Sequence, residues 1–190
     1  MMTAIYENYS DEFLIEKFCT DSDEKAMTEL FRRLVNKARS VARLYLGSAD
    51  QAEDAVQDTF IKIVRKTDRY DPKQPFLKWF YAVLRNECRD HLRKRRRRHA
   101  DDILQVNEND LPYRDEMELR SESMDLLSRI GSRERAVIRL RIVDAMSYEE
   151  IAVAVGISVD AAKKRAQRGI ARMREMVTCE KMFVGLSRAN

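Results

Sequence analysis

Four polar side chains near the C-terminus have the types and the spacing needed to read base edges in double-stranded DNA. Lys163, Lys164, Gln167 and Arg168 stand at positions i, i+1, i+4 and i+5, so a helix presents them as one exposed stripe. In the major groove, lysine and arginine donate to guanine O6 and N7, and glutamine pairs with adenine. The other cations of this segment are expected to contact phosphates, and they are Arg165, Arg172 and Arg174.

The residues around this stripe have the start and stop signals of a helix-turn-helix. Ser147 and Glu150 form a capping-box pattern that begins a short helix, and Gly156 ends it. Ser158 can cap the longer helix that follows, over residues 159–177. A short helix, a turn with glycine and a longer basic helix is the spacing of DNA-binding helix-turn-helix units. The alternative is an ordinary helical hairpin with basic, solubilising side chains, which the coincidence of cap, turn and charge disfavours.

A second polar stripe lies on a helix expected over residues 76–98. It is opposite the apolar face and consists of Trp79, Ala82, Asn86, Asp90 and Arg93, with Arg85 and Arg89 beside it. Unpaired bases are held by aromatic faces, amide edges and cations, so this stripe suits single-stranded nucleic acid. For Trp79 a place in the core is the favoured alternative, and for residues 93–98 the alternative is a nonspecific basic tail.

A third candidate surface is acidic. Glu53, Asp54, Gln57 and Asp58 share the exposed face of a helix expected over residues 52–66. This stripe is not placed to touch DNA, and it suits a basic protein partner. The alternative is a solvated face whose acidic side chains lie favourably near the helix N-terminus, and composition alone favours that alternative.

Apolar side chains recur at three- and four-residue spacing elsewhere too, which predicts helices over residues 28–46, 121–130 and 132–144. Residues 68–75 hold two of the three prolines and predict a loop. The side chains expected to face the core include Phe31, Leu34, Val35, Ala38, Ala42, Tyr45, Ala52, Ala55, Val56, Thr59, Phe60, Ile63, Val64, Ala136, Val137, Leu140 and Val143. No segment has the pattern of a strand pair, so the predicted fold class is all-α.

Charge divides the chain into blocks. The formal net charge is +4, but residues 1–60 carry −5, residues 61–100 carry +10, residues 101–130 carry −6 and residues 131–190 carry +5. Two basic blocks separated by an acidic one suggest two polyanion-binding surfaces, joined by a linker that avoids both.

The pattern therefore predicts two small helical domains, over residues 10–98 and 120–178. A flexible acidic linker is expected over residues 99–119, where periodicity is weak and Pro112 interrupts the chain.

Several function classes are disfavoured. Cys19, Cys88 and Cys179 are an odd number of cysteines far apart, which favours a reducing cytoplasm over a disulfide framework. No segment has the pattern of a secretion signal or a membrane span. There is no Walker loop and no convergent acidic constellation, so we expect no catalytic residue and no cofactor. Cys88 and His91 share a helix face, but two ligands are not a zinc site, so we expect core packing and no metal.

Two parts of the sequence resemble one bacterial family. The segments AEDAVQDTFIKI (52–63) and FLKWFYAVLRNECRDHLRKRRR (76–97) resemble region 2 of the sigma-70 family. The segment RERAVIRLRIVDAMSYEEIAVAVGISVDAAKKR (133–165) resembles its region 4. Region 3 is missing, as in the extracytoplasmic-function (ECF) branch of two-domain sigma factors. The resemblance covers residues 25–98 and 120–177.

The resemblance implies a cytoplasmic, non-enzymatic sigma factor, which binds RNA polymerase core, directs it to −35 and −10 promoter elements and promotes melting and transcription initiation. The implied partners are the polymerase core, through the β′ clamp coiled coil and the β flap, and promoter DNA; an anti-sigma factor is a further candidate. The alternative is a helix-turn-helix transcriptional regulator that acts without core polymerase, which has no need of the region 2-like segment.

The resemblance also assigns residues to three surfaces. The core-binding residues would be Glu53, Asp54, Gln57, Asp58, Phe60 and Ile61. The −10 residues would be Lys73, Lys78, Arg85, Asn86, Arg89, Asp90 and Arg93, with the loop and the helix around Asn86 capturing a flipped base of the non-template strand. The −35 residues would be Lys163, Lys164, Arg165, Gln167, Arg168 and Arg172.

Overall fold

The computed structural model describes residues 6–98 and 127–187, and the predicted all-α class is confirmed, since no strand occurs in those ranges. The elements are α1 (Asp11–Asp21), α2 (Glu24–Leu46), α3 (Ala49–Arg65), η1 (Thr67–Arg69), α4 (Phe76–Arg98), α6 (Ser132–Ile142), α7 (Tyr148–Val155) and α8 (Val159–Ser187). The predicted linker, residues 99–119, lies outside the described residues, as does most of the helix predicted over 121–130.

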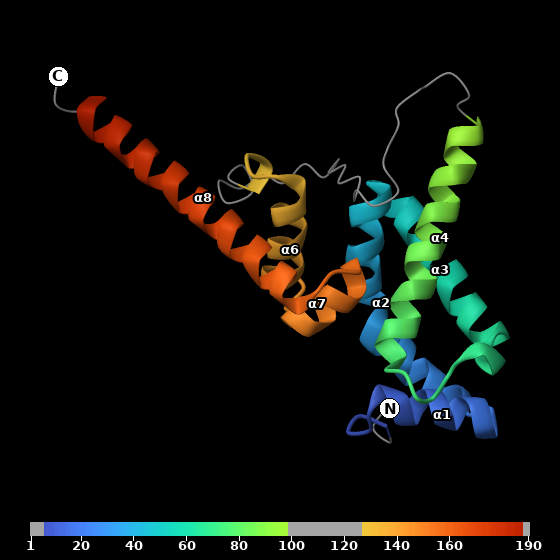
Figure 1. Ribbon diagram of the computed structural model, residues 1–190. Coiled ribbons are helices and arrows are strands. Elements are labelled where there is room, and N and C mark those ends of the chain that lie inside the picture. Colours follow the sequence, from blue (N-terminus) through green and yellow to red (C-terminus); the bar gives the residue numbers. More distant parts are fainter. Residues whose placement is uncertain (1–5, 99–126, 188–190) are drawn as a thin grey trace.

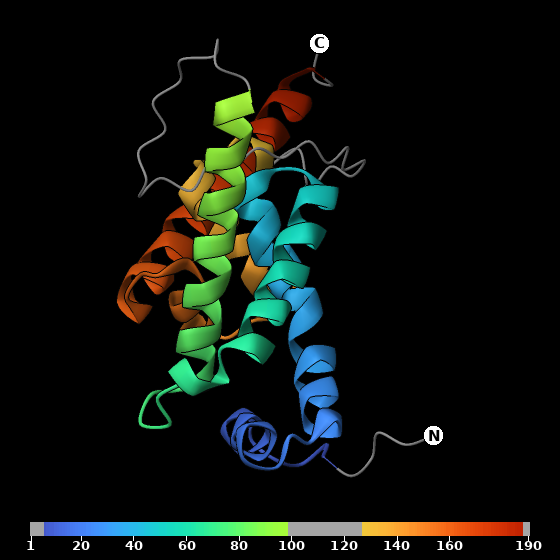
Figure 2. The ribbon, with the colours of Figure 1, turned by 90° about the vertical axis from the view of Figure 1, so that its right-hand side faces the viewer.

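The N-terminal part is a bundle of α2, α3 and α4, with α1 packed across one end (Figure 1). The turned view in Figure 2 shows the three long helices side by side. Their facing stripes bury Leu30, Ala38, Ile63, Phe80 and Leu84 almost completely. This packing confirms most of the predicted apolar faces of these helices, and it turns the polar stripes of α3 and α4 outward.

Helix α1 has no counterpart among the predicted helices. Ser10 caps it, because its Oγ accepts from the Phe13 amide at 3.2 Å, and Leu14 and Ile15 bury the inner side. Leu14, Ile15 and Phe18 do have three- and four-residue spacing, but this pattern spans a single turn and is too short to predict a helix by itself. Its Glu12 Oε1 in turn accepts from the Phe76 amide at 3.3 Å and so satisfies a free donor at the start of α4.

Glu29 of α2 is the buried charge that ties these helices together. Its side chain is 2% exposed, and its carboxylate accepts from Arg32 Nε and Arg33 Nε, each at 2.7 Å. Arg33 continues the network to Asp11 at 2.9 Å. The guanidinium of Arg32, followed by that of Arg33, lowers the pKa of Glu29 from 4.5 to about 2.

We predict that Glu29→Gln lowers the free energy of unfolding at pH 7 by about 2 kcal/mol, the scale of charge-assisted hydrogen bonds. Because the folded pKa is depressed, the stabilisation is present above pH 4.5 and is lost as the pH falls toward 2. Urea unfolding of both proteins at pH 7 and pH 3 measures this. A gap between the two proteins that stays constant with pH would contradict it.

The C-terminal part is built from α6, α7 and α8. Ser147 and Glu150 form the predicted capping box, and Gly156 ends α7 in the left-handed region at φ 78°. Helix α8 runs ten residues past its predicted end and projects away from the rest of the molecule (Figure 1). It crosses α6 closely at Gly169, where a Cβ would lie 2.4 Å from Ile138 Cδ1.

Three predicted core positions are wrong. Phe31 is 42% exposed, Val64 is 45% exposed and Val143 is 61% exposed. Phe31 contacts Phe60 of α3 with only part of its ring, Val64 lies at the edge of its apolar stripe, and Val143 follows the last residue of α6. None of the helices in the described ranges is long and apolar enough to cross a membrane.

Candidate DNA and polymerase interfaces

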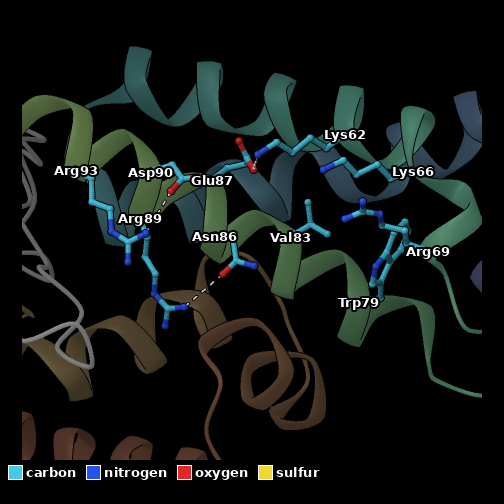
Figure 3. Close-up of a pocket in the computed structure, with 10 residues that line it drawn as sticks. All are labelled: Lys62, Lys66, Arg69, Trp79, Val83, Asn86, Glu87, Arg89, Asp90 and Arg93. Atoms are coloured by element: carbon cyan, nitrogen blue, oxygen red, sulfur yellow. Dashed lines mark hydrogen bonds and ion pairs between the residues drawn. The ribbon is translucent and has the colours of Figure 1, made fainter.

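A cavity of about 460 Å³ opens between the C-terminal end of α3, η1 and the outward face of α4 (Figure 3). Its volume is in the range of small-molecule sites. Its lining residues are Lys62, Lys66, Arg69, Trp79, Val83, Asn86, Glu87, Arg89, Asp90 and Arg93. The cavity is therefore strongly cationic, with one aromatic ring and one amide.

The side chains in this cavity orient one another. Figure 3 shows Asn86 near the middle of the lining, with Arg89 and Arg93 on one side and Trp79 on the other. Arg89 Nη1 donates to Asn86 Oδ1 at 3.4 Å, and the Arg93 guanidinium lies 3.5 Å from Asp90 Oδ1. The Asn86 amide group thus keeps its NH₂ available to donate, beside cations that can bind phosphates.

Trp79 belongs to the core and to the cavity at once. Its ring lies 5.3 Å from Tyr70 and 6.1 Å from Phe76, centroid to centroid, and it is only partly buried. The core packing favoured from the sequence is confirmed, and the ring also lines the cavity. A ring fixed in this way can offer a π-surface to an unpaired base at little cost in side-chain entropy.

The structure brings together some of the residues that the resemblance assigned to −10 DNA. Asn86, Arg89, Asp90 and Arg93 line the cavity jointly. Lys73 and Lys78 are exposed but are not among its lining residues. Arg85 points elsewhere, because its Nη1 donates to carbonyls of α7.

Three cations of this cavity were missed by sequence reasoning: Lys62, Lys66 and Arg69. The sequence does contain a pattern that could have indicated them: a lysine pair at i and i+4 at the end of α3, followed by an arginine in the next turn. Lys62 also forms an ion pair with Glu87, which is 4% exposed, so it is held against the wall of the cavity.

An apolar groove of about 600 Å³ lies between α2 and α3. Its lining residues are Met27, Thr28, Phe31, Phe60, Ile61, Val64 and Arg65. Phe31 stacks at a tilt on Phe60 with centroids 4.7 Å apart, while Ile61 is 47% exposed. Exposed apolar side chains gathered in one groove are typical of surfaces that bind a protein or a ligand.

The acidic stripe lies on the same helix as this groove. Glu53 is bound by Arg39, whose Nη2 lies 2.8 Å from Oε1, and this guanidinium lowers the pKa of Glu53. Asp58 Oδ2 lies 3.0 Å from His91 Nε2. Asp54 is the exposed carboxylate of the stripe. Phe60, predicted to bind core polymerase, is 8% exposed, so it lines the groove but offers little surface to a partner.

The helix-turn-helix presents its polar stripe to solvent. Ser158 Oγ accepts from the Ala161 amide at 3.1 Å, as predicted for the cap of α8. Ala162 and Ala166 bury the inner side of this helix. The opposite side exposes the four side chains predicted to read bases, namely Lys163, Lys164, Gln167 and Arg168. Arg172 is also exposed, whereas Arg165 is half-buried.

Cys88 is fully buried in the first domain, and burial raises the pKa of its thiol to about 12. The predicted core packing of this side chain is confirmed. Its neighbour on the helix face, His91, is paired with Asp58 instead.

The sequence and the structure were compared with those of known proteins. Residues 30–98 match the family described as Sigma-70 region 2, and residues 122–173 match Sigma-70, region 4. The RNA polymerase sigma factor CarQ of Myxococcus xanthus is 30% identical over 168 residues, which cover 86% of this chain and 95% of CarQ. The chain belongs to the sigma-70 family, in its ECF branch.

Other ECF sigma factors agree in length and fold. RpoE of Cereibacter sphaeroides is 26% identical over 157 residues, which cover 80% of this chain and 87% of that protein. The structure resembles a sigma factor RpoE solved with the anti-sigma factor NepR from Bartonella quintana, with a TM-score of 0.53, 26% identity and coverage of 81% and 98% of the two chains. CnrH, solved with the cytosolic domain of CnrY, has the same fold at a TM-score of 0.57 and 24% identity, with 89% and 97% covered.

Proposed function

We propose that this ECF sigma factor divides promoter recognition between its two domains. The domain over residues 10–98 docks on core polymerase and holds the unpaired −10 strand, and the domain over residues 120–178 reads the −35 duplex. Residues 99–119 form the linker between them. The observation that carries this proposal is the cavity on α4, which sets the Asn86 amide and the Trp79 ring among five cations.

Strand opening by this mechanism requires no catalysis by the chain. Extruding a base from the duplex costs a few kcal/mol, and a fitted pocket for that base can offset it. The cavity supplies an aromatic face, an amide edge and phosphate-binding cations in one place. Sequence reading and strand separation are then a single binding event on the surface of the polymerase.

The groove between α2 and α3 supports the docking part of the proposal. Its exposed apolar side chains supply contact area, and the exposed Asp54 on the same helix supplies charge complementary to a basic partner. On this proposal the acidic stripe binds a protein partner and is not simply a solvated helix face. An anti-sigma factor is a second partner for this chain, since a similar structure was solved with one bound.

The test is promoter binding with and without purified core polymerase. We expect the chain alone to bind promoter duplex weakly, and the mixture with core to protect both the −35 and the −10 elements from cleavage. Tight, sequence-specific protection by the chain alone, unchanged by core, would instead establish a helix-turn-helix regulator and overturn the proposal.

Arg172 gives a prediction for the −35 side. If its guanidinium neutralises one phosphate, Arg172→Gln makes the slope of log K against log salt less negative by about 1 for binding of the holoenzyme to promoter duplex. Titrations at several salt concentrations measure the slope. Lys25→Gln, which removes one exposed charge from the other domain, is the control, and equal slopes for Arg172→Gln and the wild type would refute the contact.

A further inference from the structure

The Trp79 ring contacts a buried tyrosine that does not itself line the cavity. Tyr70 is 8% exposed, and its ring lies 5.3 Å from that of Trp79 and 5.9 Å from that of Phe76, centroid to centroid. Trp79 is only partly buried, so part of its ring packs on these two rings while another part lines the cavity. Because buried side chains are closely packed, the position of Tyr70 limits the orientations that the Trp79 ring can take.

The segment between Tyr70 and α4 is a tight turn with its own hydrogen bonds. Gln74 N donates to Asp71 O at 3.0 Å, and Lys73 N donates to Asp71 Oδ1, also at 3.0 Å. Aspartate at the first position and Pro72 at the second are residues that such a turn favours. The Tyr70 hydroxyl donates to Gln74 O at 3.1 Å and so ties the two ends of the turn together. Burial raises the pKa of Tyr70, so this hydroxyl keeps its proton and remains a donor at neutral pH.

Helix α1 fixes the end of the same segment, which lies beside it (Figure 1). Glu12 Oε1 accepts from the Phe76 amide at 3.3 Å, and this amide is one of the donors that the first turn of a helix leaves without a partner. A carboxylate is also favoured at this point, because the first turn carries partial positive charge. Trp79 lies three residues after Phe76, so Glu12 caps the turn of α4 that carries the ring.

A ring that is already fixed binds a base with a smaller loss of entropy than a mobile ring does. Ordering one side chain at an interface lowers affinity by roughly two- to tenfold. Contacts that order Trp79 in the free chain avoid this loss, although they do not touch the strand. Residues that support a site in this way act through the residues that contact the ligand.

We propose that Glu12 and Tyr70 are positioning residues for the −10 strand, which hold the first turn of α4 so that the Trp79 ring lines the cavity before the strand arrives. That the ring receives an unpaired base rests on the proposed function. That these two residues fix the ring does not, and the free chain tests it. Helix α1 then takes part in −10 recognition, although none of its residues lines the cavity.

The first test uses the intrinsic fluorescence of the full-length chain. Trp79 is the only tryptophan in the sequence, so fluorescence anisotropy and quenching by acrylamide report on its ring alone. We expect Glu12→Ala and Tyr70→Phe each to lower the anisotropy and to increase the quenching. Tyr70→Phe keeps the aromatic ring, so its effect measures the hydrogen bond to Gln74 O.

Glu12→Gln is the conservative variant, because its amide oxygen can still accept from the Phe76 amide, and we expect it to recover most of the wild-type signal. Glu16→Ala is the matched control, since it removes another exposed glutamate from α1. Circular dichroism of each variant verifies that the helices are intact.

The second test is promoter opening by the holoenzyme, measured by permanganate reactivity of the −10 thymines. Glu12→Ala and Tyr70→Phe should each lower opening by about fivefold, within the range for ordering one side chain. In a Trp79→Leu background the same substitutions should have little further effect, because they act through the ring.

Wild-type anisotropy and quenching in both variants would overturn the positioning role. Effects on opening that are fully additive with Trp79→Leu would overturn it as well, because the two residues would then act elsewhere. A ring that becomes mobile in both variants while promoter opening stays at the wild-type level would contradict the part that the proposed function gives to Trp79, and the positioning of the ring would stand.

Discussion

Replacing Asn86 with alanine is expected to lower promoter opening by the holoenzyme by about 30-fold, which corresponds to about 2 kcal/mol for an amide that reads a base edge. The amide is held by Arg89 at the centre of the cavity, and alanine leaves the surrounding cations and the Trp79 ring unchanged. The loss therefore falls on the step in which the unpaired base is bound, while core association stays the same.

Permanganate reactivity of thymines in the −10 element, together with a pull-down of core polymerase, measures both quantities. Asn36→Ala is the matched control, because it removes an exposed amide from α2 in the same domain. Wild-type permanganate reactivity in the Asn86 variant would show that the cavity does not hold the unpaired strand.

Ile61→Asp is expected to weaken association with core polymerase by about 30- to 100-fold, because a buried apolar anchor at an interface contributes on the order of 2–3 kcal/mol. The Ile61 side chain is 47% exposed in the groove that Phe31 also lines. Because it is this exposed, an aspartate at this position is not forced into the core of the domain. Asp54→Lys should weaken association less, and that loss should shrink with added salt.

Tyr9→Asp is the control for this effect, since Tyr9 has the same 47% exposure but lies before α1 and is not among the residues that line the groove. Equilibrium binding of labelled chain to core polymerase measures the affinities. If Ile61→Asp binds core like the wild type, the groove is not the docking surface.

Periodicity and capping chemistry carried most of the fold prediction. The helices over α2, α3 and α4, the capping box of α7 and the cap of α8 were all predicted, because each depends on residues close in the chain. Periodicity indicates which face is apolar, but it does not say how much of that face the neighbouring helix covers. Phe31 and Val64 were therefore placed inward, although they form the exposed groove.

Only the part of the site that lies on a single helix, α4, could be predicted from the sequence. Asn86, Arg89, Asp90 and Arg93 share a stripe of α4, so spacing alone groups them. The wall opposite them comes from the end of α3 and from η1, and only the packing of α3 on α4 brings its cations to the cavity.

The contacts of Arg85 could not be predicted from local sequence either. It flanks the predicted stripe in sequence, yet its hydrogen-bond partners lie 68 and 69 residues away in α7. No local pattern indicates that contact, because it depends on how two domains meet across a long connection. The resemblance to a family could assign Arg85 to DNA, but only the fold places it between the domains.

The most direct measurement of the central claim is the mapping of RNA 5′ ends made by purified core polymerase on a genomic DNA library, with and without this chain. The account predicts a new set of start sites that share −35 and −10 elements, appears only when the chain is present and is strongly reduced with Asn86→Ala. Start sites identical in the presence and absence of the chain would contradict it.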